Sequence, residues 1–259
     1  MTTVLRCTTT EMMTVTAARR LKNGAVCFVG IGLPSTAANL ARLTHAPDAV
    51  LIYESGPIGA RPRVLPLSIG DGELADTADT VVSTAEIFRY WLQGGRVDVG
   101  FLGAAQVDRF GNINTTVIGS YDRPTVRLPG AGGAPEIASL AGEVVITVQQ
   151  SKRTFVEKVD FITSAGYLTG GDARDRLNLP GKGPAAIITD LGVLEPEPGS
   201  NEFVVTELHP SVTRAMVEET TGWPVRFSPD LHETPLPTEH ELTVLRKLLQ
   251  LTSAVHGAD

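Results

Sequence analysis

Hydrophobic positions along the chain recur either at helical spacing or in short continuous runs, and three of the helical segments begin with a capping box. In each box a Ser or Thr is followed three residues later by Glu and then by apolar residues. The boxes lie at Thr8–Glu11, Ser83–Glu86 and Thr238–Glu241. The faces expected to be buried are Met12, Val15, Ala18 and Leu21 in the first helix, Ile87, Tyr90 and Trp91 in the second, and Leu242, Leu245 and Leu249 in the third.

The short continuous apolar runs predict strands between the helices. Ala25–Val29 and Ala49–Tyr53 are the first two, and a helix beginning near Pro34 separates them, so residues 25–53 are expected to form a βαβ unit with parallel strands. Further strands are expected at Val97–Leu102, Ile113–Ile118, Val144–Gln149, Thr154–Phe161 and Ala185–Thr189, and a helix at about Ser211–Thr221. The alternation predicts an α/β fold with an open, mainly parallel sheet and flanking helices, formed as a single domain over residues 1–259.

Glu54 stands where the second predicted strand runs into a turn. The residues after it, Ser55–Gly59, carry the Gly and Pro that end a strand. In open parallel sheets, ligands bind in the crevice outside the carboxyl ends of the strands. Glu54 is therefore a candidate for the chemical centre, and a solvated loop acid is the alternative that this stretch leaves open.

Composition and charge narrow the classes of function. The formal net charge is −7 and the pI about 5.3, which disfavours nucleic acid as a partner. No apolar run is long enough to cross a bilayer, and the first residues lack the apolar core of a signal peptide. We therefore expect a cytoplasmic protein without a membrane partner. Cys7 and Cys27 give neither a disulfide framework nor metal-ligand spacing, so no metal site is expected.

Two glycine-rich segments invite a functional reading. Gly30-Ile31-Gly32 lacks the third glycine of a dinucleotide fingerprint and is interpreted as a tight turn. Leu128–Pro135 has three glycines in four residues, and a flexible loop and an oxyanion or phosphate cradle both remain open. A Ser/His/Asp hydrolase is disfavoured because no Gly-x-Ser-x-Gly elbow is present, and the histidines are expected on the surface or in loops.

Three motifs in this order carry a family resemblance. They are Glu54-Ser55-Gly56, Gln106-Val107-Asp108 with Gly111-Asn112-Ile113-Asn114, and Gly130-Ala131-Gly132-Gly133-Ala134. The chain resembles the β subunit of the class I coenzyme A transferases, with a NagB/RpiA-like fold, and is most similar to the branch with glutaconate and 3-oxoadipate CoA-transferases. Many members carry Ser-Glu-Asn-Gly at the glutamate, whereas this chain has Tyr53-Glu54-Ser55-Gly56.

The resemblance implies ping-pong transfer of CoA between two carboxylic acids. Glu54 would form a glutamyl-CoA thioester, and the backbone of Gly132, Gly133 and Ala134 would face the thioester. Gln106 and Asn114 are candidates for positioning CoA or supporting the site from behind, with hydrogen bonding to loop backbone as the alternative that stays open. CoA would be a co-substrate, with no permanently bound cofactor. The resemblance favours succinyl-CoA as donor and 3-oxoadipate as acceptor, as in β-ketoadipate breakdown of aromatic compounds, with glutaconate as the next candidate.

The resemblance also implies a second chain. Class I enzymes of this type place the active site between an α and a β subunit, so we expect an α subunit as partner, in an α2β2 assembly. Two alternatives remain open. One is a CoA-ester or C–C hydrolase on the same scaffold, whose members need not retain the glutamate, and the other is a non-catalytic subunit, in which Glu54 would be dispensable.

Overall fold

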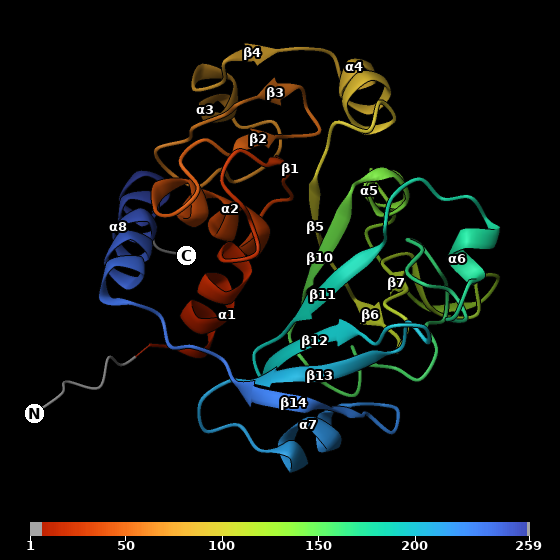
Figure 1. The fold of residues 1–259 in the computed structure, drawn as a ribbon. Coiled ribbons are helices and arrows are strands. Elements are labelled where there is room, and N and C mark those ends of the chain that lie inside the picture. Colours follow the sequence, from red (N-terminus) through yellow and green to blue (C-terminus); the bar gives the residue numbers. More distant parts are fainter. Residues whose placement is uncertain (1–6, 258–259) are drawn as a thin grey trace, which may run out of the picture. The chain divides into compact units, whose positions relative to one another are not determined.

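The computed structural model describes residues 7–257, and its contacts group the chain into two compact units (Figure 1). Unit 1 combines the residues up to Phe101 with those from Pro235 on, and unit 2 is Leu102–Thr234. The boundary falls within strand β5 (Val99–Gly103). That residues 1–259 form a single domain stays a prediction.

Unit 1 contains the predicted βαβ unit. Its elements are α1 (Thr9–Ala18), β1 (Val26–Phe28), α2 (Leu33–Leu43), β2 (Val50–Ile52), β3 (Pro57–Ile58), α3 (Gly72–Asp76), β4 (Thr80–Val81), α4 (Thr84–Glu86), a π-helix at Ile87–Leu92, and α8 (Glu239–His256). β1 pairs in parallel with β2 and with β5, whereas β2–β3 and β3–β4 are antiparallel. The parallel pairing of the first two strands is therefore confirmed.

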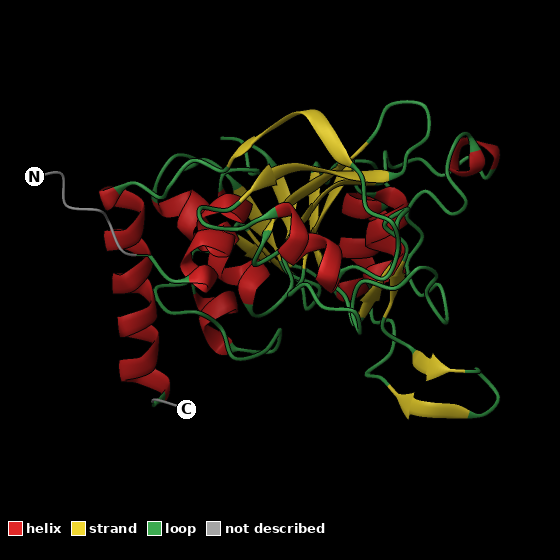
Figure 2. Cartoon of the chain, turned by 90° about the horizontal axis from the view of Figure 1, so that it is seen from below, coloured by secondary structure: helices red, strands yellow, loops and turns green. Residues whose placement is uncertain are grey.

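Helices α1, α2 and α8 lie together in unit 1 (Figure 1), and all three predicted capping boxes form. Figure 2 shows α8 as a long helix at the edge of this unit. The face predicted for α8 is wrong in one residue, because Leu248 is buried while Leu249 is 40% exposed. The helix continues to His256.

The buried face predicted after Ser83 is only partly right. The chain there continues as a π-helix at Ile87–Leu92, in which Ile87 and Leu92 are buried and Tyr90 is 60% exposed. A π-helix has i→i+5 hydrogen bonds and a wider turn than an α-helix, so the α-helical spacing used for the prediction places Tyr90 on the wrong face.

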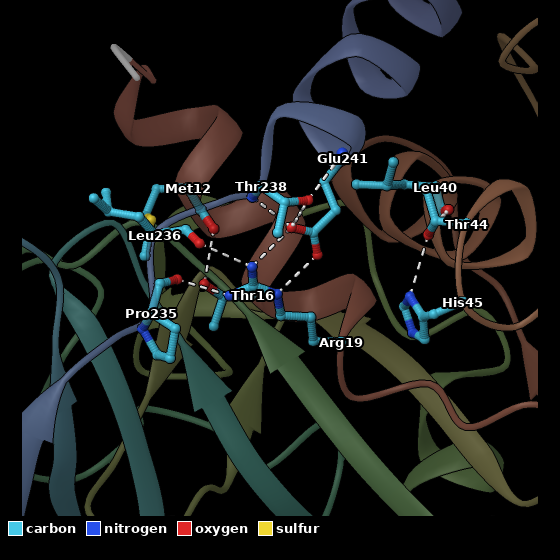
Figure 3. Close-up of polar contacts among 10 residues, drawn as sticks. All are labelled: Met12, Thr16, Arg19, Leu40, Thr44, His45, Pro235, Leu236, Thr238 and Glu241. Atoms are coloured by element: carbon cyan, nitrogen blue, oxygen red, sulfur yellow. Dashed lines mark hydrogen bonds and ion pairs between the residues drawn. The ribbon is translucent and has the colours of Figure 1, made fainter. Parts of the chain in front are cut away.

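Two ion pairs join the C-terminal segment to the start of the chain: Arg246 of α8 pairs with Glu11 of α1, and Arg19, which follows α1, pairs with Glu241. Figure 3 shows Arg19 directed at Glu241, and its Nε and Nη2 each donate to that carboxylate at 2.8 Å. The same guanidinium donates to the carbonyls of Pro235 and Leu236. Burial raises the pKa of Glu241, but the hydrogen bonds from Arg19 and Thr238 outweigh it and bring the pKa to about 2. The start of α8 is therefore held by a fixed charge and its own capping box.

Unit 2 has a mixed sheet with long loops. Its elements are β6 (Gln106–Val107), β7 (Ile113–Asn114), β8 (Val117–Gly119), β9 (Pro124–Arg127), α5 (Ala134–Leu140), β10 (Glu143–Thr147), α6 (Ala173–Arg176), β11 (Pro184–Ile188), β12 (Gly192–Pro196), β13 (Phe203–Leu208), α7 (Arg214–Thr220) and β14 (Phe227–Glu233). β10–β11 and β13–β14 are parallel, and β11–β12 and β12–β13 are antiparallel. The predicted α/β fold with a mainly parallel sheet and flanking helices is confirmed, and antiparallel strands extend it.

The strand predicted at Thr154–Phe161 is wrong. This segment makes one isolated bridge, between Phe155 and Val107, rather than a ladder. Its backbone bonds include Val107 N–H to the Thr154 carbonyl at 2.7 Å and Val156 N–H to the Val107 carbonyl at 3.1 Å. Two apolar residues of the segment, Phe155 and Val159, are buried. The run is therefore apolar because these side chains belong to the core, although the backbone is not a strand.

Arg174 of α6 is a buried cation whose hydrogen bonds, within residues 7–257, all go to backbone carbonyls. It is 3% exposed, and its guanidinium donates to the carbonyls of Ala138, Ala165, Gly166 and Gly181 at 2.7 to 3.1 Å. Burial lowers its pKa, although an arginine stays charged at any ordinary pH. Arg174 therefore ties the end of α5 to two loops of unit 2.

His209 follows β13 in a loop, as predicted for the histidines, but it is buried. Its Nδ1 lies 3.0 Å from Thr234 Oγ1 and its Nε2 lies 2.9 Å from the Thr189 carbonyl. The carbonyl only accepts, so Nε2 carries the proton and Nδ1 accepts from the Thr234 hydroxyl. Burial lowers the pKa of His209.

Replacing Arg174 by Met should lower the free energy of unfolding by roughly 3 kcal/mol, because buried carbonyls lose a charged donor. Urea denaturation measures the change. Arg176→Met is the matched control: this side chain lies on the same helix, is exposed, and pairs with Asp172, so its loss should cost less than about 1 kcal/mol. Equal losses in the two variants would contradict the assignment of Arg174 as the anchor.

Lowering the pH from 7.5 to 5.5 should destabilise the protein through His209. An unfolded imidazole takes up a proton near pH 6.5 whereas the buried one resists it, so the unfolded state binds more protons as pH falls through this range. The free energy of unfolding should fall by up to about 1.4 kcal/mol per pH unit. Urea denaturation at both pH values should show a flatter dependence in His209→Gln and an unchanged one in His240→Gln, which alters an exposed residue.

Candidate functional site

Glu54 lies in the turn that joins β2 to β3. The Tyr53 amide donates to the Pro57 carbonyl at 3.1 Å, and the Gly56 amide donates to the Tyr53 carbonyl at 3.0 Å. Glu54 and Ser55 occupy the two positions between the residues that close this turn. Since β2 is parallel to β1, the turn follows the carboxyl end of a parallel strand, as predicted.

Gly56 fixes the shape of this turn. Its φ is +121°, and a Cβ built on it would lie 2.0 Å from the Val82 carbonyl oxygen. The two backbones are joined there, because Val82 N–H donates to the Gly56 carbonyl at 3.1 Å. Only glycine has both the conformational freedom and the missing side chain that this approach requires.

The buried side chain of Tyr53 anchors the start of the turn. Its side chain is fully buried, Asn39 Nδ2 donates to its hydroxyl at 3.4 Å, and Ser35 Oγ lies 3.3 Å from the same oxygen. Burial raises the pKa of Tyr53, so the phenol stays neutral. On the other side, Ser55 Oγ donates to the Ile69 carbonyl.

The Glu54 side chain is half-buried, and within residues 7–257 it accepts no hydrogen bond and forms no ion pair. The two arginines that follow it in the sequence have other partners. Arg61 pairs with Asp79, with Nη2 3.2 Å from Oδ2, and Arg63 Nε lies 3.4 Å from Glu73 Oε1. In the part of the chain described, the Glu54 carboxylate thus has no polar partner, and the backbone bonds of the turn place the residue.

The glycine-rich segment of unit 2 leads into α5. Gly133 is the N-cap of that helix, and Gly130 and Gly132 have φ of +106° and +52°. The Ala134 amide donates to the Ala131 carbonyl at 3.1 Å, whereas the amides of Gly132 and Gly133 have no acceptor among the described residues. The Ala131 amide also lacks an acceptor there, so three consecutive amides of the segment are unpaired among the described residues.

Gln106 and Asn114 meet across the β6–β7 pair. Asn114 Nδ2 donates to Gln106 Oε1 at 2.7 Å, and Gln106 Nε2 donates to Asp160 Oδ2 at 3.0 Å. Asn114 Oδ1 also accepts the amide of Thr116 at 2.9 Å. Both side chains are buried, and they form their hydrogen bonds with each other and with loop residues. They would therefore affect a ligand indirectly, by positioning these loops.

Two further groups in this region, Asp160 and Asp108, were not among the predicted site residues. Asp160 accepts from Gly119 N–H at 2.9 Å as well as from Gln106, and it lies in the segment wrongly predicted as a strand. Asp108 accepts from both the amide and the side chain of Asn112 at 3.1 Å. Burial raises the pKa of Asp108 despite these bonds. In the sequence, the spacing Asp108-x-x-Gly111-Asn112 is the signal that predicts a loop closed by hydrogen bonds from Asn112 to Asp108.

Glu54 belongs to unit 1, and the other predicted site residues, Gln106, Asn114, Gly132, Gly133 and Ala134, belong to unit 2. The structure brings Gln106 and Asn114 together. Across residues 7–257, His, Cys, Asp and Glu side chains nowhere gather in a set of three that would hold a metal ion. In the same residues, every helix is too short or too polar to cross a bilayer.

Comparison with known proteins gives the family. Residues 10–220 match the family model described as coenzyme A transferase. The chain is 74% identical, over 249 residues, to the β subunit of the 3-oxoadipate CoA-transferase of Pseudomonas knackmussii, with 96% of each chain covered. It is 36% identical to the β subunit of the glutaconate CoA-transferase of Acidaminococcus fermentans, with 85% of each chain covered.

A solved structure agrees in fold. The crystal structure of glutaconate coenzyme A-transferase from Acidaminococcus fermentans superposes with a TM-score of 0.89 at 32% identity, covering 96% of this chain and 97% of that one. The matched family model spans most of the chain, including the β2–β3 turn with Glu54 and the glycine-rich segment before α5. This chain therefore belongs to the coenzyme A transferase family.

Proposed function

We propose that this chain is the glutamate-bearing β subunit of a CoA-transferase and that Glu54 is its nucleophile. The observation that carries the proposal is the Glu54 carboxylate, which is unpaired within residues 7–257 and held in a tight turn by backbone bonds. An ion pair would occupy the lone pairs of the carboxylate and lower its nucleophilicity, whereas no described residue occupies those of Glu54. The family membership supports the same residue.

The proposed chemistry proceeds in two exchanges. The Glu54 carboxylate attacks the thioester carbonyl of an acyl-CoA, which gives an acyl-glutamyl anhydride and CoA thiolate. The thiolate then attacks the glutamyl carbonyl, which gives a glutamyl-CoA thioester and the free acid. A second acid reverses these steps. A carboxylate nucleophile suits the reaction because only an anhydride keeps it near thermoneutral without ATP.

Each attack places negative charge on a carbonyl oxygen, which backbone N–H groups can stabilise. The amides of Gly132 and Gly133 are proposed as donors, because they have no acceptor among the described residues. Losing one such donor costs roughly 3 to 4 kcal/mol of transition-state stabilisation in other enzymes. The Ala134 amide already donates to Ala131, so it contributes only if the turn opens.

The substrates and the partner are proposed from the relatives. The protein that is 74% identical is named for 3-oxoadipate CoA transfer, which supports 3-oxoadipate as acceptor. Succinyl-CoA is proposed as donor from the family resemblance. That relative is named as one subunit of its enzyme, which supports a separate α chain here. An α2β2 assembly, CoA as co-substrate and a cytoplasmic location complete the proposal. Glutaconate is the next acceptor to test, because the relative at 36% identity carries that name.

Trapping tests the nucleophile directly. The co-expressed complex is incubated with succinyl-CoA and no acceptor acid, reduced with borohydride, and digested for mass spectrometry. The peptide with Glu54 should carry the alcohol left by reduction of the glutamyl thioester, and Glu54→Gln should carry none and lose activity. Glu239→Gln, on exposed α8 surface, should behave as the unchanged protein. Release of CoA without a modified Glu54 would favour the hydrolase, and full activity of Glu54→Ala would favour a non-catalytic subunit.

Gly56→Ala should lower both stability and activity, because the new Cβ would force the turn away from Val82. We expect a loss of about 2 kcal/mol or more in unfolding free energy and at least a tenfold loss in kcat. Gly72→Ala is the control: a Cβ there meets nothing within 4 Å and lies in α3, so it should be neutral or stabilising. Wild-type kcat in Gly56→Ala would show that the turn does not orient Glu54.

A further inference from the structure

Unit 1 contains a cavity that the proposed reaction does not use. Its volume is about 400 Å³, within the usual range for small-molecule sites. It lies between the end of α2, the loop after β3, and α8, and Glu54 is not part of its lining. The lining residues are Arg42, Leu43, Arg61, Pro62, Arg63, Val244, Lys247, Leu248 and Leu251.

The lining carries more positive than negative charge. Of its four cations, Arg61 pairs with Asp79 and Arg63 pairs with Glu73. Within the described residues, Arg42 and Lys247 have no carboxylate partner. The cavity therefore presents two uncompensated positive charges, which attract an anion of matching charge.

Arg42 is already held in place for such an anion. Its Nη2 lies 3.4 Å from Asn39 Oδ1 and 3.2 Å from the Pro62 carbonyl. Its Nε is buried and has no hydrogen-bond partner in the described residues, and burial lowers its pKa without removing the charge. Because protein atoms cover this Nε, an anion in the cavity would meet the part of the half-buried Arg42 side chain that lines it, where the guanidinium charge attracts it.

The rest of the lining is apolar. Leu43 and Leu251 are 42% and 45% exposed, and Val244 and Leu248 lie on α8 beside them. A hydrated inorganic ion would gain nothing from these side chains, whereas a hydrocarbon body would be removed from water.

We infer that this cavity is a binding site for a small dicarboxylate with an apolar spacer, separate from Glu54. One carboxylate is received by Arg42 and the other by Lys247, and the methylene groups lie against the leucines. The inference does not rest on the CoA-transfer chemistry, because its readout is binding alone.

Calorimetry with adipate on the full-length protein, in its complex with the partner chain, tests the site. Adipate should bind, while the uncharged isostere adipamide and inorganic phosphate should bind at least tenfold more weakly. Binding should weaken as salt rises, since exposed Lys247 is screened. Equal binding of phosphate, or no binding of adipate, would overturn the inference.

Two variants of α8 locate the site. Leu251→Glu places a negative charge in the lining and should weaken adipate binding at least tenfold, whereas Leu249→Glu, a similarly exposed leucine of the same helix outside the lining, should leave it unchanged. Lys247→Gln should weaken binding at least threefold and Lys22→Gln, elsewhere in unit 1, should not. Unchanged binding in Leu251→Glu would overturn the assignment to this cavity.

Discussion

The turn at Tyr53–Gly56 is the constraint on which the placement of Glu54 depends. Two backbone hydrogen bonds close it, and the contact between Gly56 and Val82 leaves no room for a side chain. The backbone therefore fixes where the Glu54 side chain leaves the turn, and among the described residues no polar partner holds its carboxylate. A carboxylate without a polar partner stays available to a substrate, which fits the role proposed for it.

In unit 2, side chains form the hydrogen bonds that the backbone groups of long loops require. Its long loops leave backbone groups that no sheet satisfies, and buried polar groups must be paired. Arg174 supplies donors to carbonyls of three segments, and Asn112 Oδ1 accepts the amides of Gly166 and Leu168. Gln106 and Asn114 belong to the same set, because their side chains bond to each other and to loop residues.

The sequence predicted what local rules determine. Capping boxes located three helix starts, and Gly and Pro located the turn of Glu54 because these residues act through their own φ angles. The π-helix and the loop at Thr154–Phe161 were missed for the same reason. An apolar run shows that a segment is buried, but it does not show which backbone hydrogen bonds the segment forms. Asp160 was missed because its partner Gln106 lies far away in the chain, and a single sequence carries no sign of such a contact.

The scaffold alone does not decide between transfer and hydrolysis. A glutamyl thioester or anhydride is open to water unless the site excludes it, and the same carboxylate would serve either outcome. The difference therefore depends on what covers the turn, not on Glu54 itself. Within the described part of unit 1, the loop whose Ile69 carbonyl accepts from Ser55 contacts this turn. Since that loop carries few buried side chains, a second surface is needed to exclude water, which gives a physical reason for a transferase of this kind to require a partner chain.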